Sequence, residues 1–396
     1  MPGSKLEMDD LSESALLDEA RSKTGLTDFG SDDFREGLRA LLEMYDTTAR
    51  LSAQGRKVTR RRILELLNNR LFIQETFKRH PEIKARPIRR PMYLTGLPRT
   101  GTSALFNLLA IDEASRPLLY WEGCYPYPPP GSVARGEPDP RLVALRESIH
   151  HLRQKDPEFA KVHEVSADGP EECVQLLAHT LSGVQLGVEP LISPYREWFE
   201  KQDLRAPYAY YADLLRMLDW QRPGERWLLK SPAHLWALDV LVGMFPDACI
   251  IQTHRDPARI IGSYCSMVAM LMRGREGVDP RQLGPAVLEY LARSVERGMA
   301  ARDELGPARF IDVSYRQFVK DPIGTAEQIY AAFQLELAPR TVDAMRKHVA
   351  DHPQNKHGAH TYTLADYGLT AEMVSARLAR YIERFALGRG DEKGAA

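Results

Sequence analysis

The chain contains 396 residues, of which 43% are hydrophobic and 27% are charged, the composition of an ordinary globular protein. Its 53 basic and 54 acidic residues leave a formal net charge of −1, so no overall field attracts it to nucleic acid or to an anionic membrane. An anionic ligand must therefore be held by a local cluster of hydrogen-bond donors.

The first 85 residues are predicted to form a helical N-terminal extension. Between residues 33 and 47 the apolar positions recur at intervals of three and four, which places them on one face of a helix. A second helix is expected over residues 56–80, which are rich in arginine and leucine. Its basic run, Arg60-Arg61-Arg62, is interpreted as a solvated helix face rather than as a nucleic-acid patch.

After Pro87, short apolar strands begin to alternate with helices. Strands are predicted at 90–95, 227–230, 248–253 and 309–315, and helices at 103–110, 234–244, 257–272 and 322–333. The alternation predicts an α/β fold, a three-layer sandwich with a central parallel sheet like that of the P-loop nucleoside triphosphatases. We divide the chain into the extension 1–85, an α/β domain 86–340 with a helical insertion at about 141–222, and a C-terminal segment 341–396.

The cysteines and the N-terminus bear on the compartment. None of the four cysteines forms a CxxC pair, and Cys249 and Cys265 stand in segments typical of a buried strand and a buried helix. Isolated cysteines of this kind favour a reducing compartment. No basic region followed by a long apolar stretch marks a signal peptide, and no apolar run reaches the length of a membrane span. The expected location is the cytoplasm.

The loop Gly96-Leu97-Pro98-Arg99-Thr100-Gly101-Thr102-Ser103 has the frame of a phosphate-binding loop, with two glycines before a hydroxyl pair. Between a strand and a helix, such a loop offers backbone N–H groups and a helix N-terminus to an anion. Thr102 stands where a nucleoside triphosphatase has lysine, and Arg99 instead puts a cation inside the loop. Because its guanidinium can bind an oxyanion in bidentate fashion, the loop favours a mono- or diester-like anion over a magnesium triphosphate.

A second cluster, Gln252-Thr253-His254-Arg255-Asp256-Pro257, follows another predicted strand. Ser263 stands eight positions after Arg255, which is near two turns along a helix with about 3.6 residues per turn. The carboxyl ends of parallel strands are where open α/β sheets bind their ligands. Alone, this cluster would be interpreted as a capped helix start, but beside the loop it predicts a second phosphate site.

Together these segments resemble the sulfotransferase superfamily, above all the bacterial branch whose loop reads PR-S/T-GT. The resemblance covers about residues 90–335 and includes four motifs: PRTGTS at 98–103, LKSPAH at 229–234, THRDP at 253–257 with its serine at 263, and SYRQFVKDP at 314–322. It implies 3′-phosphoadenosine 5′-phosphosulfate as the sulfuryl donor. No sequence pattern for a metal site is present, and no metal is expected.

The resemblance also implies roles for individual residues. The 5′-phosphosulfate would be held by Pro98, Arg99, Thr100, Gly101, Thr102 and Ser103, and the 3′-phosphate by Arg255 and Ser263. Tyr315 would lie near the adenine. Lys356-His357-Gly358 resembles a family element that closes over the 3′-phosphate, although cytosolic members carry Arg-Lys-Gly there.

For catalysis, the resemblance places a transition-state lysine at Lys230, with Arg99 as a further cation. Three residues compete for the role of general base. Glu122, predicted to end a strand, is ranked first by similarity to the tyrosylprotein sulfotransferases, and His163 follows closely because an unperturbed imidazole suits proton transfer near neutral pH. His234 is third, since the cytosolic branch has a histidine just after the matching lysine.

The acceptor is expected to be a small, apolar molecule with a hydroxyl or an amine, because aromatic residues gather at 120–130 and 198–211. No nucleic-acid partner is expected. Two roles stay open for the extension 1–85, a cover over the acceptor pocket and a homodimer contact. The alternatives are a nucleotide kinase or triphosphatase, which Thr102 disfavours, and a non-catalytic nucleotide-binding relative, which Lys230 disfavours.

Overall fold

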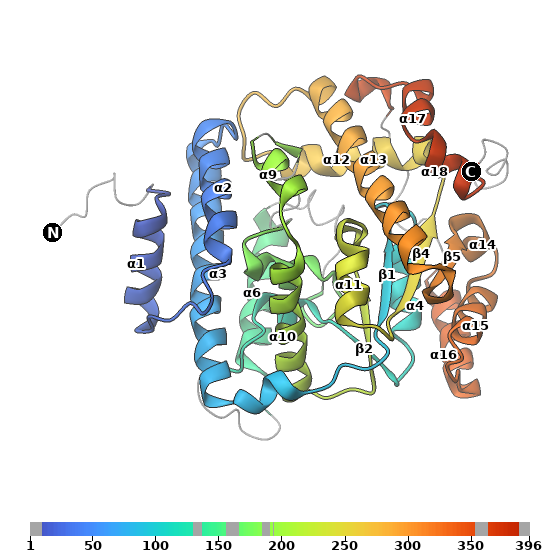
Figure 1. The fold of residues 1–396 in the computed structure, drawn as a ribbon, viewed down its shortest axis with the longest axis horizontal. Coiled ribbons are helices and arrows are strands. Elements are labelled where there is room, and N and C mark those ends of the chain that lie inside the picture. Colours follow the sequence, from blue (N-terminus) through green and yellow to red (C-terminus); the bar gives the residue numbers. More distant parts are fainter. Residues whose placement is uncertain are drawn as a thin grey trace.

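The computed structural model describes residues 10–129, 137–155, 166–183, 191–192, 194–352 and 363–387. Its centre is a sheet of five parallel strands in the order β2-β3-β1-β4-β5 (Figure 1). The strands are β1 (Met92–Gly96), β2 (Ser115–Pro117), β3 (Arg226–Lys230), β4 (Cys249–His254) and β5 (Phe310–Ser314). The strands predicted at 90–95, 227–230, 248–253 and 309–315 are thus confirmed, and the short edge strand β2 lies just before the segment predicted to form a strand ending at Glu122.

The pairing of β1 determines where the functional segments meet. On one side Leu94 pairs with Lys230 of β3, and on the other side Gly96 pairs with Thr253 of β4. Because all the strands are parallel, the carboxyl ends of β3, β1 and β4 lie together at one edge of the sheet. This is the edge where ligands bind in open α/β folds.

Alternate side chains of the strands enter two separate apolar cores, one on each face of the sheet. Tyr93, Leu229 and Ile250 belong to the larger core, which also contains residues of η5, α10, α11, α12 and α13. Leu94 and Ile251 belong to the smaller core, with residues of α4 and α15. The structure therefore confirms the three-layer α/β sandwich with a central parallel sheet.

Helices precede the sheet and also lie between β2 and β3. The N-terminal helices are α1 (Glu13–Thr24), α2 (Phe34–Thr47), α3 (Ala53–Arg79) and the 3₁₀ turn η2 (Pro81–Ala85). Between β1 and β3 lie α4 (Thr102–Leu109), α5 (Tyr120–Cys124), α6 (Pro140–Lys155), α8 (Val174–Leu177), η3 (Ala178–Thr180), α9 (Tyr195–Lys201) and α10 (Arg205–Gln221). Buried side chains of α1, α2 and α3 share the larger core with the sheet.

The second half of the chain adds the remaining layers. It contains η5 (Pro232–Ala237), α11 (Leu238–Met244), α12 (Pro257–Leu271), α13 (Pro280–Leu305), η6 (Pro307–Arg309), α14 (Tyr315–Lys320), α15 (Pro322–Ala332), α16 (Pro339–Asp351), η7 (Ala365–Tyr367), α17 (Ala371–Arg377) and α18 (Ala379–Arg384). The long helix α13 was not predicted. It packs against η5 and α12, and Figure 1 shows it running across the sheet beside α12.

Two features that bear on the cellular compartment, the helices and the cysteines, can be examined in the structure. Among the described residues, no helix combines the length and apolarity that a bilayer crossing demands. All four cysteines are buried free thiols, and Cys249 and Cys265 lie in β4 and α12, as their sequence context predicted.

Candidate active site

The glycine-rich loop joins β1 to α4 at the carboxyl edge of the sheet, and its two glycines are required by close contacts. Gly96 has φ 134°, and a Cβ there would lie 2.5 Å from the carbonyl oxygen of Thr253. Gly101 has φ 86°, and a Cβ there would lie 2.8 Å from the ring of Tyr315. The glycines therefore let the loop approach both β4 and α14. The loop leads directly into the N-terminus of α4, whose first N–H groups have no acceptor within the helix.

Threonine side chains fix the inner side of the loop. Thr100 is fully buried, and its hydroxyl donates to the carbonyl of Leu97 (2.6 Å) and lies 2.6 Å from the hydroxyl of Thr253. Thr102, at the position of the missing lysine, is also buried and begins α4. Thr100 therefore holds the loop against β4, while Arg99 and Ser103 are exposed.

Arg99 connects the loop to the second predicted phosphate site. Its Nε donates to the hydroxyl of Ser263 on α12 at 2.9 Å, and its backbone has φ 66°, a conformation uncommon for a residue with a Cβ. Arg255, just beyond β4, donates to the carbonyl of Arg99 at 3.3 Å. The Arg255 guanidinium also lies 4.0 Å from the centre of the Tyr315 ring. The structure thus brings together Arg99, Arg255, Ser263 and Tyr315, which the sequence had assigned to one nucleotide site.

Lys230 ends β3 and joins the loop from the other side. Its ammonium donates to the hydroxyl of Ser103 at 3.0 Å and forms an ion pair with Glu172 at 2.9 Å, although only 5% of the lysine side chain is exposed. The backbone N–H of Cys173 donates to the carbonyl of Lys230 at 2.8 Å, which holds the segment of Glu172 beside the end of β3. A cation, a hydroxyl and a carboxylate therefore meet at the loop.

The comparison with known proteins agrees with this arrangement. A sequence model described as "Sulfotransferase family" matches residues 91–339, more than half of the chain. The chain belongs to the sulfotransferase family. The matched range begins just before β1 and ends at the start of α16, so it contains the whole sheet and the loop.

Solved sulfotransferase structures share the fold over nearly the whole chain. Sulfotransferase STF1 from Mycobacterium tuberculosis H37Rv is 35% identical and superposes with a TM-score of 0.83, over 93% of this chain and 98% of that chain. Sulfotransferase STF9 from Mycobacterium avium is 29% identical, with a TM-score of 0.85 over 96% of this chain and 98% of that chain. The similarity therefore includes the N-terminal helices.

A curated relative is the omega-hydroxy-beta-dihydromenaquinone-9 sulfotransferase Stf3 of Mycobacterium bovis, which is 24% identical over 302 residues, or 74% of each chain. The relatives are named as enzymes, and this protein is a sulfotransferase. The kinase or triphosphatase alternative is accordingly not favoured.

The local structure around Glu122 differs from the one predicted. The prediction that it ends a strand is wrong, because β2 stops at Pro117 and Glu122 lies in α5. Its carboxylate accepts the backbone N–H of Leu119 and forms ion pairs with Arg116 and Arg222, both at 3.0 Å, while only 1% of the side chain is exposed. These contacts cap the helix and neutralise the buried charge.

The histidine candidates have separate outcomes. His234 is fully buried, its Nδ1 lies 2.9 Å from the hydroxyl of Tyr208, and burial lowers its pKa to about 3. The imidazole lies among the rings of Tyr93, Tyr208 and Tyr211, so the structure gives His234 the position of a core residue. His163 lies outside the described residues, as do Lys356, His357 and Gly358.

The C-terminal helices contact the sheet next to Arg255. The Tyr381 hydroxyl of α18 lies 3.0 Å from Nδ1 of His254, the last residue of β4. Nε2 of His254 lies 2.8 Å from Asp312 of β5, and the Phe385 ring stacks on the imidazole with centroids 4.0 Å apart. Burial lowers the pKa of His254. This part of the C-terminal segment therefore supports the residue that precedes Arg255.

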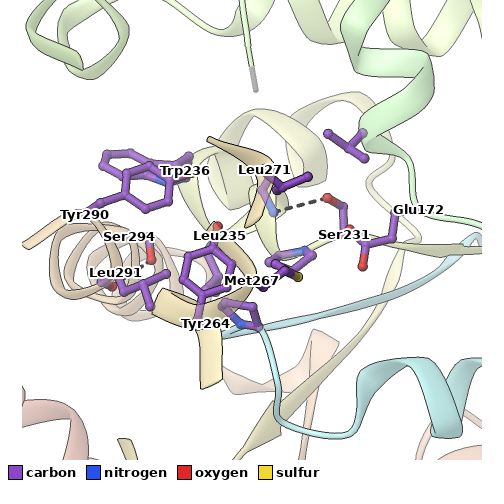
Figure 2. A pocket seen from close by; sticks show the side chains of 14 residues that line it. Glu172, Ser231, Leu235, Trp236, Tyr264, Met267, Leu271, Tyr290, Leu291 and Ser294 are labelled. Carbon is purple, nitrogen blue, oxygen red and sulfur yellow. Dashed lines mark hydrogen bonds between the residues drawn. The ribbon is translucent and has the colours of Figure 1, made fainter. Parts of the chain in front are cut away.

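The aromatic segments predicted to form an acceptor pocket belong instead mainly to the core. Tyr208 and Tyr211 are buried, and Trp198 packs against the same core with its indole N–H donating to Glu36. A cavity does lie next to Glu172, but most of its walls come from η5, α12 and α13 (Figure 2), and Pro98 of the loop also lines it. Glu172 and this cavity were both missed. The only signal for Glu172 was the pair Glu171-Glu172 in the stretch that also contains His163.

Proposed function

We propose that this sulfotransferase moves a sulfuryl group from 3′-phosphoadenosine 5′-phosphosulfate to an acceptor hydroxyl, with Lys230 as the cation that stabilises the transferred charge. The carrying observation is that one ammonium contacts both Ser103 of the loop (3.0 Å) and Glu172 (2.9 Å). A cation placed where negative charge develops lowers the barrier most in a site that excludes water, and Lys230 is almost fully buried.

The residues around Arg99 suit a donor with phosphate groups at both the 5′ and 3′ positions of one ribose. Arg99 of the loop donates a hydrogen bond to Ser263, and Arg255 donates one to the backbone carbonyl of Arg99. The two proposed phosphate sites would therefore adjoin. Arg99 and the α4 N-terminus would hold the 5′ group, and Arg255 with Ser263 the 3′-phosphate. Tyr315 lies against both Gly101 and Arg255, a position that suits contact with the adenosine. Lys356, His357 and Gly358 stay predictions for the 3′-phosphate.

Glu172 is the group we assign as general base. An ionised carboxylate only accepts hydrogen bonds, and Glu172 is 27% exposed beside the lysine. The acceptor O–H proton passes to its carboxylate, the acceptor oxygen bonds to sulfur, and the bond from sulfur to the 5′-phosphate oxygen breaks with its electron pair on that oxygen. Glu122 has its acceptor sites occupied by two arginines and a backbone N–H, so we place the base at Glu172 instead.

A hydroxyl is favoured over an amine as the acceptor group. The Stf3 relative is named for an omega-hydroxylated dihydromenaquinone, which carries an apolar body and a hydroxyl. An amine that is protonated in water would bring a second cation next to Lys230, and like charges at short distance repel.

Calorimetric titration with 3′-phosphoadenosine 5′-phosphate and with ATP–Mg tests the donor. The bisphosphate should bind more tightly, and Ser263→Ala should weaken it by about tenfold, the effect of one lost hydrogen bond to a charged group. Ser148→Ala is the matched control, because Ser148 is an exposed helical serine that bonds only to the carbonyl of Ala144. Preference for ATP–Mg would overturn the proposed function.

A further inference from the structure

A cavity lies beside Glu172 between three helical segments, and Pro98 of the loop also contributes to its lining. Its walls include Leu235 and Trp236 of η5, Tyr264 and Met267 of α12, and Leu291 of α13. Figure 2 shows these side chains surrounding the space, with Glu172 and Ser231 at one end and Trp236 and Tyr290 at the other. The Trp236 and Tyr290 rings stack with centroids 5.3 Å apart. Most of the surface offered to a ligand is therefore hydrocarbon or aromatic.

The charge in this lining is confined to one end. Glu172 is the one ionisable acid or base among the lining residues apart from the two tyrosines. The hydroxyl of Ser294 donates to the carbonyl of Leu291 (2.7 Å), and the hydroxyl of Ser231 accepts from the backbone N–H of Ala233 (3.2 Å). These serines are already hydrogen-bonded to the backbone, so Glu172 supplies the strongest acceptor for a ligand hydroxyl.

The position of Glu172 connects the cavity to the transfer chemistry. Its carboxylate forms an ion pair with Lys230, whose ammonium donates a hydrogen bond to Ser103 of the loop. A hydroxyl hydrogen-bonded to Glu172 would thus lie at the boundary between the loop and the cavity. The carbon skeleton next to that hydroxyl would then occupy the apolar part.

The size of the cavity limits what this skeleton can be. It encloses about 140 Å³, close to the roughly 150 Å³ of an apolar cavity that holds one benzene molecule. A six-membered ring or a branched chain of similar volume fits, next to the aromatic wall. Further hydroxyls on that ring would have few partners, and each unpaired hydroxyl should weaken binding on the order of tenfold.

From this geometry we propose that the cavity is the acceptor site and that the acceptor is a neutral alcohol with an apolar ring or branched group beside its hydroxyl. The proposal rests on the proposed function, because it needs the sulfuryl donor at the loop. It assigns Leu235, Trp236, Met267 and Leu291 to acceptor specificity, and it predicts rejection of sugars of the same size.

Two matched probes test the chemistry of the site: cyclohexylmethanol and methyl glucopyranoside both carry a primary alcohol on a six-membered ring. With labelled donor, kcat/KM for cyclohexylmethanol should be at least about 100-fold higher, because the glucoside buries several unpaired hydroxyls. Equal rates, or preference for the glucoside, would overturn the proposal.

A cavity-filling variant tests the location. Ala233→Phe should lower kcat/KM for cyclohexylmethanol by at least about tenfold and that for propanol by less than about threefold, without changing affinity for 3′-phosphoadenosine 5′-phosphate. Ala344→Phe, on an exposed position of α16, is the control. If Ala233→Phe does not fold, Met267→Ala replaces it. This variant should raise kcat/KM for the bulkier 4-tert-butylcyclohexylmethanol relative to kcat/KM for cyclohexylmethanol.

Nucleotide binding and the relative rates with different alcohols test the proposed function and the acceptor site separately. If the wild-type protein fails to bind 3′-phosphoadenosine 5′-phosphate, the proposed function fails and the acceptor proposal fails with it. If the nucleotide binds and alcohols are sulfated, but neither cavity variant changes the relative rates, only the acceptor proposal is overturned.

Discussion

Two carboxylates lie near the ends of neighbouring strands in this sulfotransferase, and their surroundings differ sharply. Glu122, after β2, contacts two arginines and a backbone N–H and is 1% exposed. Glu172, beside the end of β3, contacts the ammonium of Lys230 and is 27% exposed at a cavity. The difference teaches that residue type and strand position are insufficient to identify a catalytic acid or base. The number of partners and the access to a ligand decide.

The largest expected effect comes from the cation of the Glu172 site. Lys230→Ala should lower kcat by about 10³-fold, because it removes the charge that stabilises the transition state. Steady-state kinetics measure it, with urea unfolding as a check on stability. Lys57→Ala, at an exposed position of α3, is the control and should keep normal turnover. A Lys230→Ala enzyme of near-normal activity would remove this residue from the mechanism.

Substitution of Glu122 should instead lower the free energy of unfolding. Glu122→Ala leaves Arg116 buried without its carboxylate, and burial already lowers the pKa of that guanidinium to about 10. Breaking one partner of a buried ion pair typically costs 3 kcal/mol or more, so we expect a loss of about 3 kcal/mol in the free energy of unfolding. Urea denaturation measures the loss. Activity of the folded fraction should stay within about threefold of wild type; a stable but inactive variant would return Glu122 to the role of base.

Glu172→Gln should lower kcat by about 100-fold, the contribution of a general base, with little change in affinity for 3′-phosphoadenosine 5′-phosphate. Turnover assays and calorimetry on the same preparation separate the two quantities. Glu122→Gln is the matched substitution in the other carboxylate site and should be far less damaging to turnover. If the two glutamine variants lose activity equally, the contrast between the sites is wrong.

The smallest expected effect is on the pH dependence of the free energy of unfolding, which depends on two buried histidines rather than on the two carboxylates. Burial lowers the pKa of His179 and of His234 to about 3, below the ordinary value of about 6.5. Between these values the unfolded chain binds more protons than the folded protein, so the contribution of each histidine to stability is fully present above pH 6.5 and falls as the pH drops. Each histidine contributes a slope approaching 1.4 kcal/mol per pH unit, about one proton.

Urea unfolding between pH 7 and pH 5 measures this slope. His234→Gln should reduce the pH dependence of stability, whereas His150→Gln, at an exposed position of α6, should leave it unchanged. An unaltered slope in His234→Gln would show that this imidazole titrates alike in the folded and unfolded protein, so that burial does not lower its pKa.

Local patterns were sufficient to predict the sheet and the meeting of the loop with the Arg255 cluster. The spacing of Gly96 and Gly101 predicted a loop between a strand and a helix, and the structure places this loop between β1 and α4. Close contacts to Thr253 and to Tyr315 leave no room for a Cβ at either glycine. Arg255 and Ser263 were predicted to share a ligand from helical spacing, and both contact Arg99. Such features follow from short-range geometry, which sequence periodicity records directly.

The acceptor side could not be obtained in the same way. Glu172 reaches Lys230 because the backbone of Cys173 bonds to the end of β3, a contact between segments 57 residues apart in sequence. The aromatic stretches that suggested a pocket are packed into the core, since large apolar side chains serve both purposes. The cavity combines residues of η5, α12 and α13, and α13 was not predicted.

By itself, the sequence determined a glycine-rich loop with an arginine in place of the usual lysine chemistry, a second basic cluster and a lysine at a strand end, because each depends on residues close together in the chain. Only the tertiary structure decided which carboxylate is available to an acceptor. Packing pairs Glu122 with two arginines and leaves Glu172 in the lining of a cavity. The physical reason is that desolvation and partner count are properties of the assembled interior, and no single segment specifies them.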